Sequence, residues 1–106
     1  TVDGALGTDT DVIPDEFVLH QNYPNPFNPS TDIKFSLPST EKVHLVVYDL
    51  LGNVVREMVN EELSPGKYTY KWKGENQNGS RVSAGMYFYQ IQAGSFIQTR
   101  KMILLK

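Results

Sequence analysis

The chain has 106 residues, of which 40% are apolar and 21% charged, and its formal net charge is −2. These values are typical of one soluble globular domain, and the near balance of charge argues against binding to nucleic acid or to an anionic membrane. The absence of cysteine excludes disulfides, thiolate zinc sites and cysteine nucleophiles. No stretch approaches the ~20 apolar residues of a membrane span, and no N-terminal signal peptide is recognisable.

Residues 1–15 are predicted to form a flexible acidic linker. Residues 1–16 carry five acidic side chains and no Lys or Arg. Few of their side chains are large and apolar, so burial cannot offset the entropy lost on ordering. The folded domain is therefore expected over residues 16–106, tethered to an upstream catalytic or adhesive domain of the same polypeptide.

The remainder of the chain predicts an all-β protein. The proline segment, Asn22–Ser30, has three prolines in six residues, so it is neither helix nor central strand and is expected to be extended and rigid. Apolar and polar residues then alternate, with a slip after residue 54 that indicates a bulge. The predicted strands are residues 17–19, 31–37, 42–48, 54–59, 68–72, 85–93 and 96–105. About seven short strands at steady spacing predict an immunoglobulin-like antiparallel β-sandwich.

Aromatic residues are dense in the second half of the chain. Most of them fall on the inward phase of their strands and are predicted to be core: Tyr70, Trp72, Tyr87 and Tyr89. Phe88 and Tyr48 fall on the opposite phase, which suits a recognition surface or packing against the proline segment. Residues 83–89 suggest a tyrosine corner, a Tyr tied back to nearby backbone. No internal repeat is found.

Several motifs occur together and in order. They are Asn22-Tyr23-Pro24-Asn25-Pro26-Phe27-Asn28-Pro29-Ser30-Thr31, Val47-Tyr48-Asp49-Leu50-Leu51-Gly52, Trp72-Lys73-Gly74, Gly85-Met86-Tyr87-Phe88-Tyr89 and Lys101-Met102-Ile103-Leu104-Leu105-Lys106. As a set they resemble the type A C-terminal sorting domain of the type IX secretion system. The pattern is also similar to the immunoglobulin-like domain of flagellar hook-capping proteins.

The first resemblance implies a non-catalytic sorting module. An outer-membrane translocon would read it, and a sortase-like peptidase would cleave at the upstream linker, so that the parent protein is secreted or held at the cell surface after passing through the periplasm. It also implies which residues to consider as the signal: Lys101, Met102, Ile103, Leu104, Leu105, Lys106, Gly85 and Tyr87. The family motif itself is Pro24, Asn25, Pro26, Phe27, Asn28 and Pro29, in a longer form than many members of the family carry.

A few other residues are of types that occur in metal or catalytic sites. Oxygen side chains in the loop Gly74–Ser80 suggest calcium, but the first ligand position is Gly74 and the closing Glu is missing, so a hairpin loop is favoured. The lone His20 and His44 have no triad partners, and Glu61-Glu62 are expected in a turn as a solvated pair. No metal, cofactor or catalytic residue is predicted.

The last strand, by contrast, has two compatible interpretations. It can be a core strand whose lysines guard its edge, or a terminal strand with an unpaired edge that a receptor captures by strand addition. The chain is thus expected to be a monomeric sorting module without enzymatic activity. The alternatives are a structural spacer or an adhesive, carbohydrate-binding sandwich attached to a secreted enzyme, and a hook-cap domain.

Overall fold

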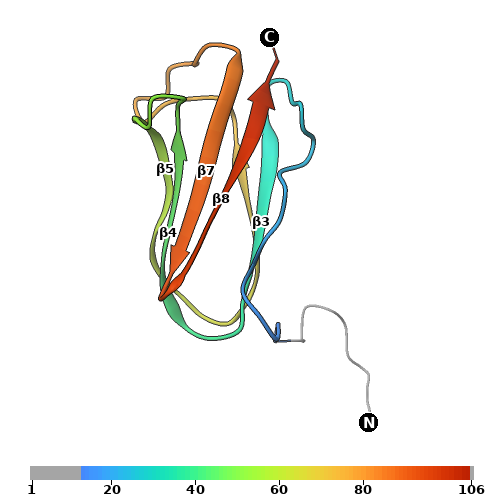
Figure 1. The fold of residues 1–106 in the computed structure, drawn as a ribbon, viewed down its shortest axis with the longest axis vertical. Coiled ribbons are helices and arrows are strands. Elements are labelled where there is room, and N and C mark those ends of the chain that lie inside the picture. The colour runs from blue at the N-terminus through green and yellow to red at the C-terminus, as the bar shows by residue number, and fades with distance from the viewer. Residues whose placement is uncertain (1–12, 106) are drawn as a thin grey trace.

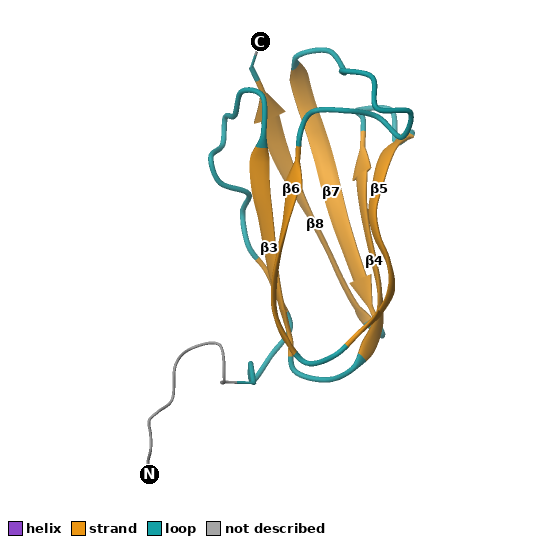
Figure 2. Cartoon of the chain, turned by 180° about the vertical axis from the view of Figure 1, so that it is seen from behind, coloured by secondary structure: helices purple, strands orange, loops and turns teal. Residues whose placement is uncertain are grey.

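A computed structural model describes residues 13–105, and every regular element among them is a strand. One sheet has the order β2-β3-β6 and the other the order β5-β4-β7-β8, with all neighbours antiparallel. The first sheet contains β2 (Val18–Leu19), β3 (Thr31–Leu37) and β6 (Gly66–Trp72). The second contains β4 (Glu41–Tyr48), β5 (Val54–Leu63), β7 (Gly85–Ala93) and β8 (Phe96–Leu104). The two sheets pack face to face (Figures 1 and 2), which confirms the predicted immunoglobulin-like sandwich.

The core lies between the sheets and follows the alternation of the sequence. Side chains two residues apart point to the same face of a strand. Accordingly Val43, Leu45 and Val47 of β4 are fully buried, and Ile33 and Leu37 of β3 face them from the other sheet. No helix that could span a membrane occurs in residues 13–105. The inward phases predicted for β3 and β4 are confirmed.

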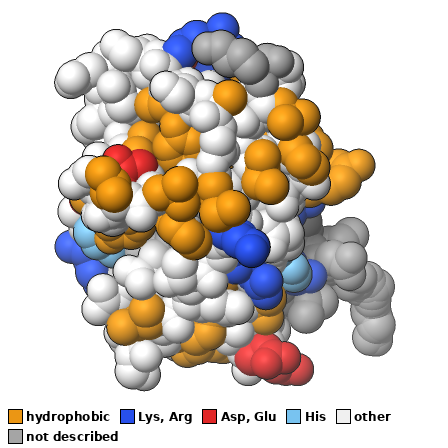
Figure 3. Space-filling view, turned by 45° about the horizontal axis from the view of Figure 1, so that its top comes forward, with side chains coloured by type: hydrophobic (Ala, Val, Ile, Leu, Met, Phe, Trp, Pro, Cys, Tyr) orange, Lys and Arg blue, Asp and Glu red, His pale blue; other side chains and the backbone are white. Residues whose placement is uncertain are grey.

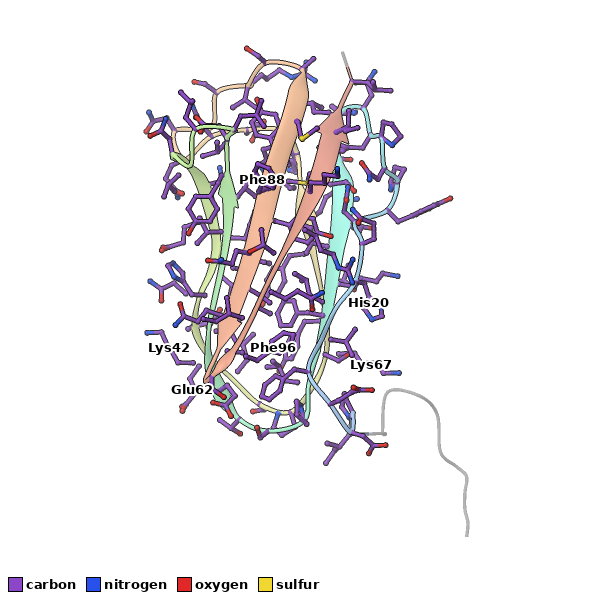
Figure 4. All side chains as sticks on the ribbon, viewed as in Figure 1. His20, Lys42, Glu62, Lys67, Phe88 and Phe96 are labelled. Carbon is purple, nitrogen blue, oxygen red and sulfur yellow. The ribbon has the colours of Figure 1, made fainter. Side chains whose placement is uncertain are left out.

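The strand β5 is longer than its apolar pattern predicted, because it continues through Leu63. Glu61 and Glu62 were expected in a turn, but they pair with Val43 and Lys42 of β4. Figure 4 shows Glu62 beside Lys42 at the edge of the sheet. The prediction failed because β5 is an edge strand, whose exposed face accepts charged residues as readily as a turn does. The expected bulge is present, as two register shifts between β4 and β5.

The β6 edge also corrects one core assignment. Tyr70 was predicted to be core, but it is only half-buried. Its ring and that of Tyr68 stack on the two sides of Phe35, at centroid distances of 5.8 and 5.4 Å. An edge strand has no neighbour on one side, so its inward aromatic rings lie at the rim of the core. Trp72, Tyr87 and Tyr89 are buried as predicted.

The sandwich has two distinct ends. The apex, as we call one end, holds the turn 49–53, the loop 73–84 and the end of β8 (Figure 1). The opposite end holds the first described residues and the β7–β8 hairpin, whose turn begins at Gly94 with a φ of +59°. Ile13 therefore lies far from Leu105. Residues 1–12, most of the predicted linker, lie outside the described residues.

Candidate functional site

The proline segment lies along the outer edge of β8. The Phe27 amide donates to the Ile103 carbonyl at 3.0 Å, and the Leu105 amide donates to the Phe27 carbonyl at 2.8 Å. These two bonds make a bridge of the parallel kind. The Asn25 Oδ1 accepts a third bond, from the Ile103 amide at 2.9 Å. The structure thus brings the family motif and the sorting-signal candidates of the chain end into direct contact.

This contact corrects the expectation of an unpaired edge at the end of the last strand. On one side β8 pairs with β7 as far as Leu104, and on the other side the proline segment covers its end. Met102 and Leu104 are 0% and 5% exposed, so they belong to the core. The alternate residues Lys101, Ile103 and Leu105 are exposed. Lys106 lies outside the described residues.

Buried hydrogen bonds hold the base of the proline segment. The side chains of Asn22 and Thr31 bond each other at 2.9 Å, and both donate to the Pro24 carbonyl. The Tyr89 hydroxyl donates to the His20 carbonyl at 2.6 Å and accepts from the Asn22 amide at 2.7 Å. Burial raises the pKa of Tyr89 to about 12. Because every buried side-chain polar atom of the described residues has a partner, the network fixes the segment firmly.

The polar network was not predicted, since Asn22 was taken as a turn residue of the proline segment and Thr31 as the first residue of a strand. The segment bends at residues 24–26 and 28–29, which suits the turn-forming Asn residues between its prolines. A bend is needed because Phe27 turns inward while its neighbours stay exposed.

Phe27 anchors the segment to the core. It is 1% exposed, and its ring centroid lies 5.6 Å from that of Trp72. Trp72 in turn meets Tyr87 edge-on at 5.3 Å and donates its indole N–H to the Glu75 carbonyl at 2.9 Å. Edge-on and tilted aromatic pairs of this kind add to the stability gained from burial alone. Motif and core are therefore one packing unit.

Two tyrosine corners shape the loops, where one was predicted. Tyr87 donates its hydroxyl to the Ser83 carbonyl, and Tyr68 donates to the Ser64 carbonyl, both at 2.6 Å. Each corner has the pattern Ser-x-Gly-x-Tyr, and the two glycines have φ of +144° and +155°, which disfavour any other residue. The repeated pentapeptide, residues 64–68 and 83–87, is visible in the sequence and was missed. Gly85 and Tyr87 thus have a structural role, and their part in a sorting signal remains a prediction.

The loop Gly74–Ser80 uses its own oxygens to fold. The Asn76 Oδ1 accepts from the Asn78 and Ser80 amides, both at 3.0 Å. The Gln77 Oε1 accepts from the Glu57 amide at 2.8 Å and so covers part of the β5 edge. Residues 13–105 contain no cluster of three or more His, Asp or Glu side chains that could hold a metal ion.

The histidines lie apart from the seam between the proline segment and β8. His44 contacts the Glu57 carboxylate at 2.7 Å, with both side chains 42% exposed. The His20 side chain is exposed beside β3 (Figure 4). An exposed contact of this kind contributes little to stability, and it offers no third catalytic group.

The apex also exposes apolar side chains at the β4–β5 turn, which β7 and β8 separate from the seam. Leu50, Leu51 and Val54 are 63%, 87% and 63% exposed. Backbone hydrogen bonding from Asn53 lowers the pKa of Asp49 and, with a bond from the Leu51 amide, keeps this turn in one conformation. Figure 3, with the apex turned forward, shows hydrophobic side chains gathered over this end. Such gatherings on a surface are typical of interaction sites.

The outward aromatics extend this surface down the four-stranded sheet. Tyr48 and Phe88 are cross-strand neighbours, and the next outward residue of β7, Met86, pairs with Ile103 of β8. All but Ile103 are half-buried. Their predicted use in recognition remains a prediction.

Fold, core and loop corners together define a small immunoglobulin-like β-sandwich. Within this class, residues 25–95 match the model of the FlgD Ig-like domain. The match covers more than half of the chain, so the chain belongs to the FlgD Ig-like domain family. Domains of this type are typically non-catalytic. No curated protein matches the chain.

Solved structures share the fold. Dimeric latent PorU from Porphyromonas gingivalis superimposes with a TM-score of 0.68 at 20% identity, over 90% of this chain and 10% of PorU. FlgD from P. aeruginosa gives a TM-score of 0.54 at 23% identity, over 70% of this chain and 58% of FlgD. PorZ, an essential surface component of the type IX secretion system of P. gingivalis, gives 0.55 at 15% identity, over 94% of this chain and 13% of PorZ. The chain thus spans a small part of PorU and PorZ and over half of FlgD.

Proposed function

We propose that this domain is a sorting module that directs an attached protein through a type IX secretion system. The observation that carries the proposal is the seam, which joins the family motif and the chain-end motif into one surface at the apex. The motif set resembles that of type A sorting domains, and the fold is shared with PorZ, a component of that system. The proposed partners are the outer-membrane translocon, a sortase-like peptidase and an upstream domain. The proposed destination is the cell surface or the medium, and the domain acts as a monomer.

The buried half of the last strand refines the mechanism. A receptor that captured a free terminal strand would have to remove Met102 and Leu104 from the core, and burying such side chains stabilises a fold by about 1.5–3 kcal/mol each. We therefore propose recognition of the folded surface. The signal is then the set of outward side chains at the seam, Lys101, Ile103 and Leu105, together with the exposed residues of the proline segment.

The test is a reporter fused to the full chain in a host that has the secretion system. Ile103→Ser should stop delivery of the reporter to the cell surface and leave the thermal melt nearly unchanged. Ile97→Ser is the matched control, since Ile97 is an outward isoleucine of the same strand, more exposed at 56% than Ile103 at 37%, and far from the seam. Equal delivery of both variants would contradict recognition at the seam. Failure of the unsubstituted fusion to reach the surface would contradict the sorting role itself.

Membership of the FlgD Ig-like family favours a second candidate, a structural module within a larger extracellular or flagellar assembly. In that case the unsubstituted fusion would stay in the periplasm. The burial of Trp72, Tyr87 and Tyr89 removes the main aromatic platform that a carbohydrate-binding role would have used.

A further inference from the structure

The apex contains a small hollow bounded by three separate segments. Pro29 of the proline segment, Leu104 of β8 and the loop residues Gly74 and Val82 form its walls, and its volume is about 150 Å³. Lys73 and Arg81 also line it. Three of the motifs singled out in the sequence thus meet at one place, although they are far apart along the chain.

The hollow is preformed by the backbone. Gly74 has a φ of +69°, and a Cβ at this position would come within 3.1 Å of the Pro29 carbonyl and 3.5 Å of a Leu104 methyl group. The left-handed φ and the tight approach to the Pro29 carbonyl therefore both favour glycine at this position, while the distance to Leu104 is an ordinary contact. The Val82 amide donates to the Gly74 carbonyl at 3.0 Å, which holds the two sides of the loop together.

The hollow is apolar inside and cationic at its rim. Pro29, Val82 and Leu104 supply apolar surface, while Lys73 and Arg81 supply two positive charges and no acidic side chain lines the hollow. Among residues 13–105 the charged contacts join His44 to Glu57 and Lys71 to Asp32, so neither rim cation has an ion-pair partner within this range. The side chains of Lys73 and Arg81 are both exposed and both line the hollow.

Size and charge together identify the ligand. Ligand pockets usually measure about 300–1,000 Å³, so a hollow of this volume holds one side chain rather than a whole organic ligand or an acyl chain. From this combination of an apolar floor, a volume for one side chain and two rim cations that have no ion-pair partner in the described part of the chain, we infer that the hollow binds an acidic peptide segment of a partner protein. One apolar side chain fills the hollow, and carboxylates flanking it pair with Lys73 and Arg81. Arg in particular forms two parallel hydrogen bonds with a carboxylate.

Binding at the hollow does not depend on the sorting role, so the two can fail separately. The experiment titrates the full chain, labelled with nitrogen-15, with the blocked tripeptide acetyl-Asp-Leu-Asp-amide and follows the amide signals by NMR. We expect saturable shifts at Gly74, Val82 and Leu105. Replacing both Asp by Asn, or the Leu by Gly, should weaken binding at least fivefold.

Variants test the rim. Lys73→Gln and Arg81→Gln should each weaken the tripeptide about two- to fivefold, the range expected for an exposed charge pair. The matched control is Lys67→Gln. Lys67 is an exposed lysine within β6, whereas Lys73 directly follows that strand, and Lys67 lies toward the opposite end of the sandwich (Figure 4). Absence of saturable shifts would overturn the inference, and so would an equal effect of Lys67→Gln, which would mean nonspecific attraction. Equal binding of inorganic phosphate at the same amides would also overturn it, since the hollow would then be a phosphate site.

Discussion

The Tyr89 hydroxyl is the most informative single group to remove. It donates to the His20 carbonyl and accepts from the Asn22 amide, and Asn22 is 2% exposed. Tyr89→Phe keeps the buried ring and leaves both backbone groups without this partner. The unsatisfied buried Asn22 amide costs about 1–3 kcal/mol, and loss of the part-buried bond to the His20 carbonyl adds about 1 kcal/mol, so the free energy of unfolding should fall by about 2–4 kcal/mol. For a domain of this size that lowers the melting temperature by on the order of 10–20 °C.

Urea denaturation followed by circular dichroism measures this change. Tyr48→Phe is the matched control, because Tyr48 is a half-buried tyrosine on the outer face of the neighbouring strand β4, with no hydrogen bond from its hydroxyl to the described residues. Its unfolding free energy should change by less than about 0.5 kcal/mol, as for most surface substitutions. A Tyr89→Phe effect as small as that of the control would refute the argument that this hydroxyl holds the base of the proline segment.

Three further results are expected. Trp72→Ala should lower the free energy of unfolding in urea by about 3–5 kcal/mol because the indole is 1% exposed, whereas Tyr23→Ala, at 78% exposure, should lower it by less than about 0.5 kcal/mol. Similar values for the two variants would contradict the burial of Trp72. Leu104→Ala should cost about 2–5 kcal/mol and its exposed neighbour Leu105→Ala much less, and the reverse order would mean that the last strand is out of register. Because burial raises the pKa of Tyr89 from 10.0 to about 12, the unfolded chain loses that proton first; stability should fall between pH 10 and 12, by about 1.4 kcal/mol per pH unit, and the fall should be smaller in Tyr89→Phe.

Strand phase was the part of the fold that the sequence predicted well. Alternation placed Val43 and Leu45 inside because a strand between two neighbours has one buried and one exposed face. At the edges this rule weakens, which is why β5 was predicted four residues too short and Tyr70 too deep. The Ser83–Tyr87 corner was predicted from its local pattern, and the Ser64–Tyr68 corner could have been found in the same way.

The candidate site was beyond such reasoning for a physical reason. The bond between Asn25 and Ile103 joins residues 78 positions apart, and neither residue has a local signature of it. The sequence does not show that the proline segment near the start of the domain pairs with the end of β8. Only the tertiary arrangement of the two sheets brings these two segments together. The rim of the hollow could not be predicted either. In the sequence Lys73 and Arg81 are indistinguishable from ordinary solvated charges, and only the folded loop brings them to one place.

The parallel bridge between Phe27 and the end of β8 has a mechanical consequence. If tension acts between Ile13 and Leu105, the proline segment is drawn toward one end of the sandwich and β8 toward the other. The two hydrogen bonds of Phe27 then carry load along the strand direction, in shear, and must break together. In the antiparallel β7–β8 hairpin, pulling at the chain end would instead open the bonds one at a time. Resistance to forced unfolding depends on the unfolding rate under load, and a shear contact between the first and last parts of a domain slows it. The seam is therefore a clamp that protects the module when its two ends are pulled apart.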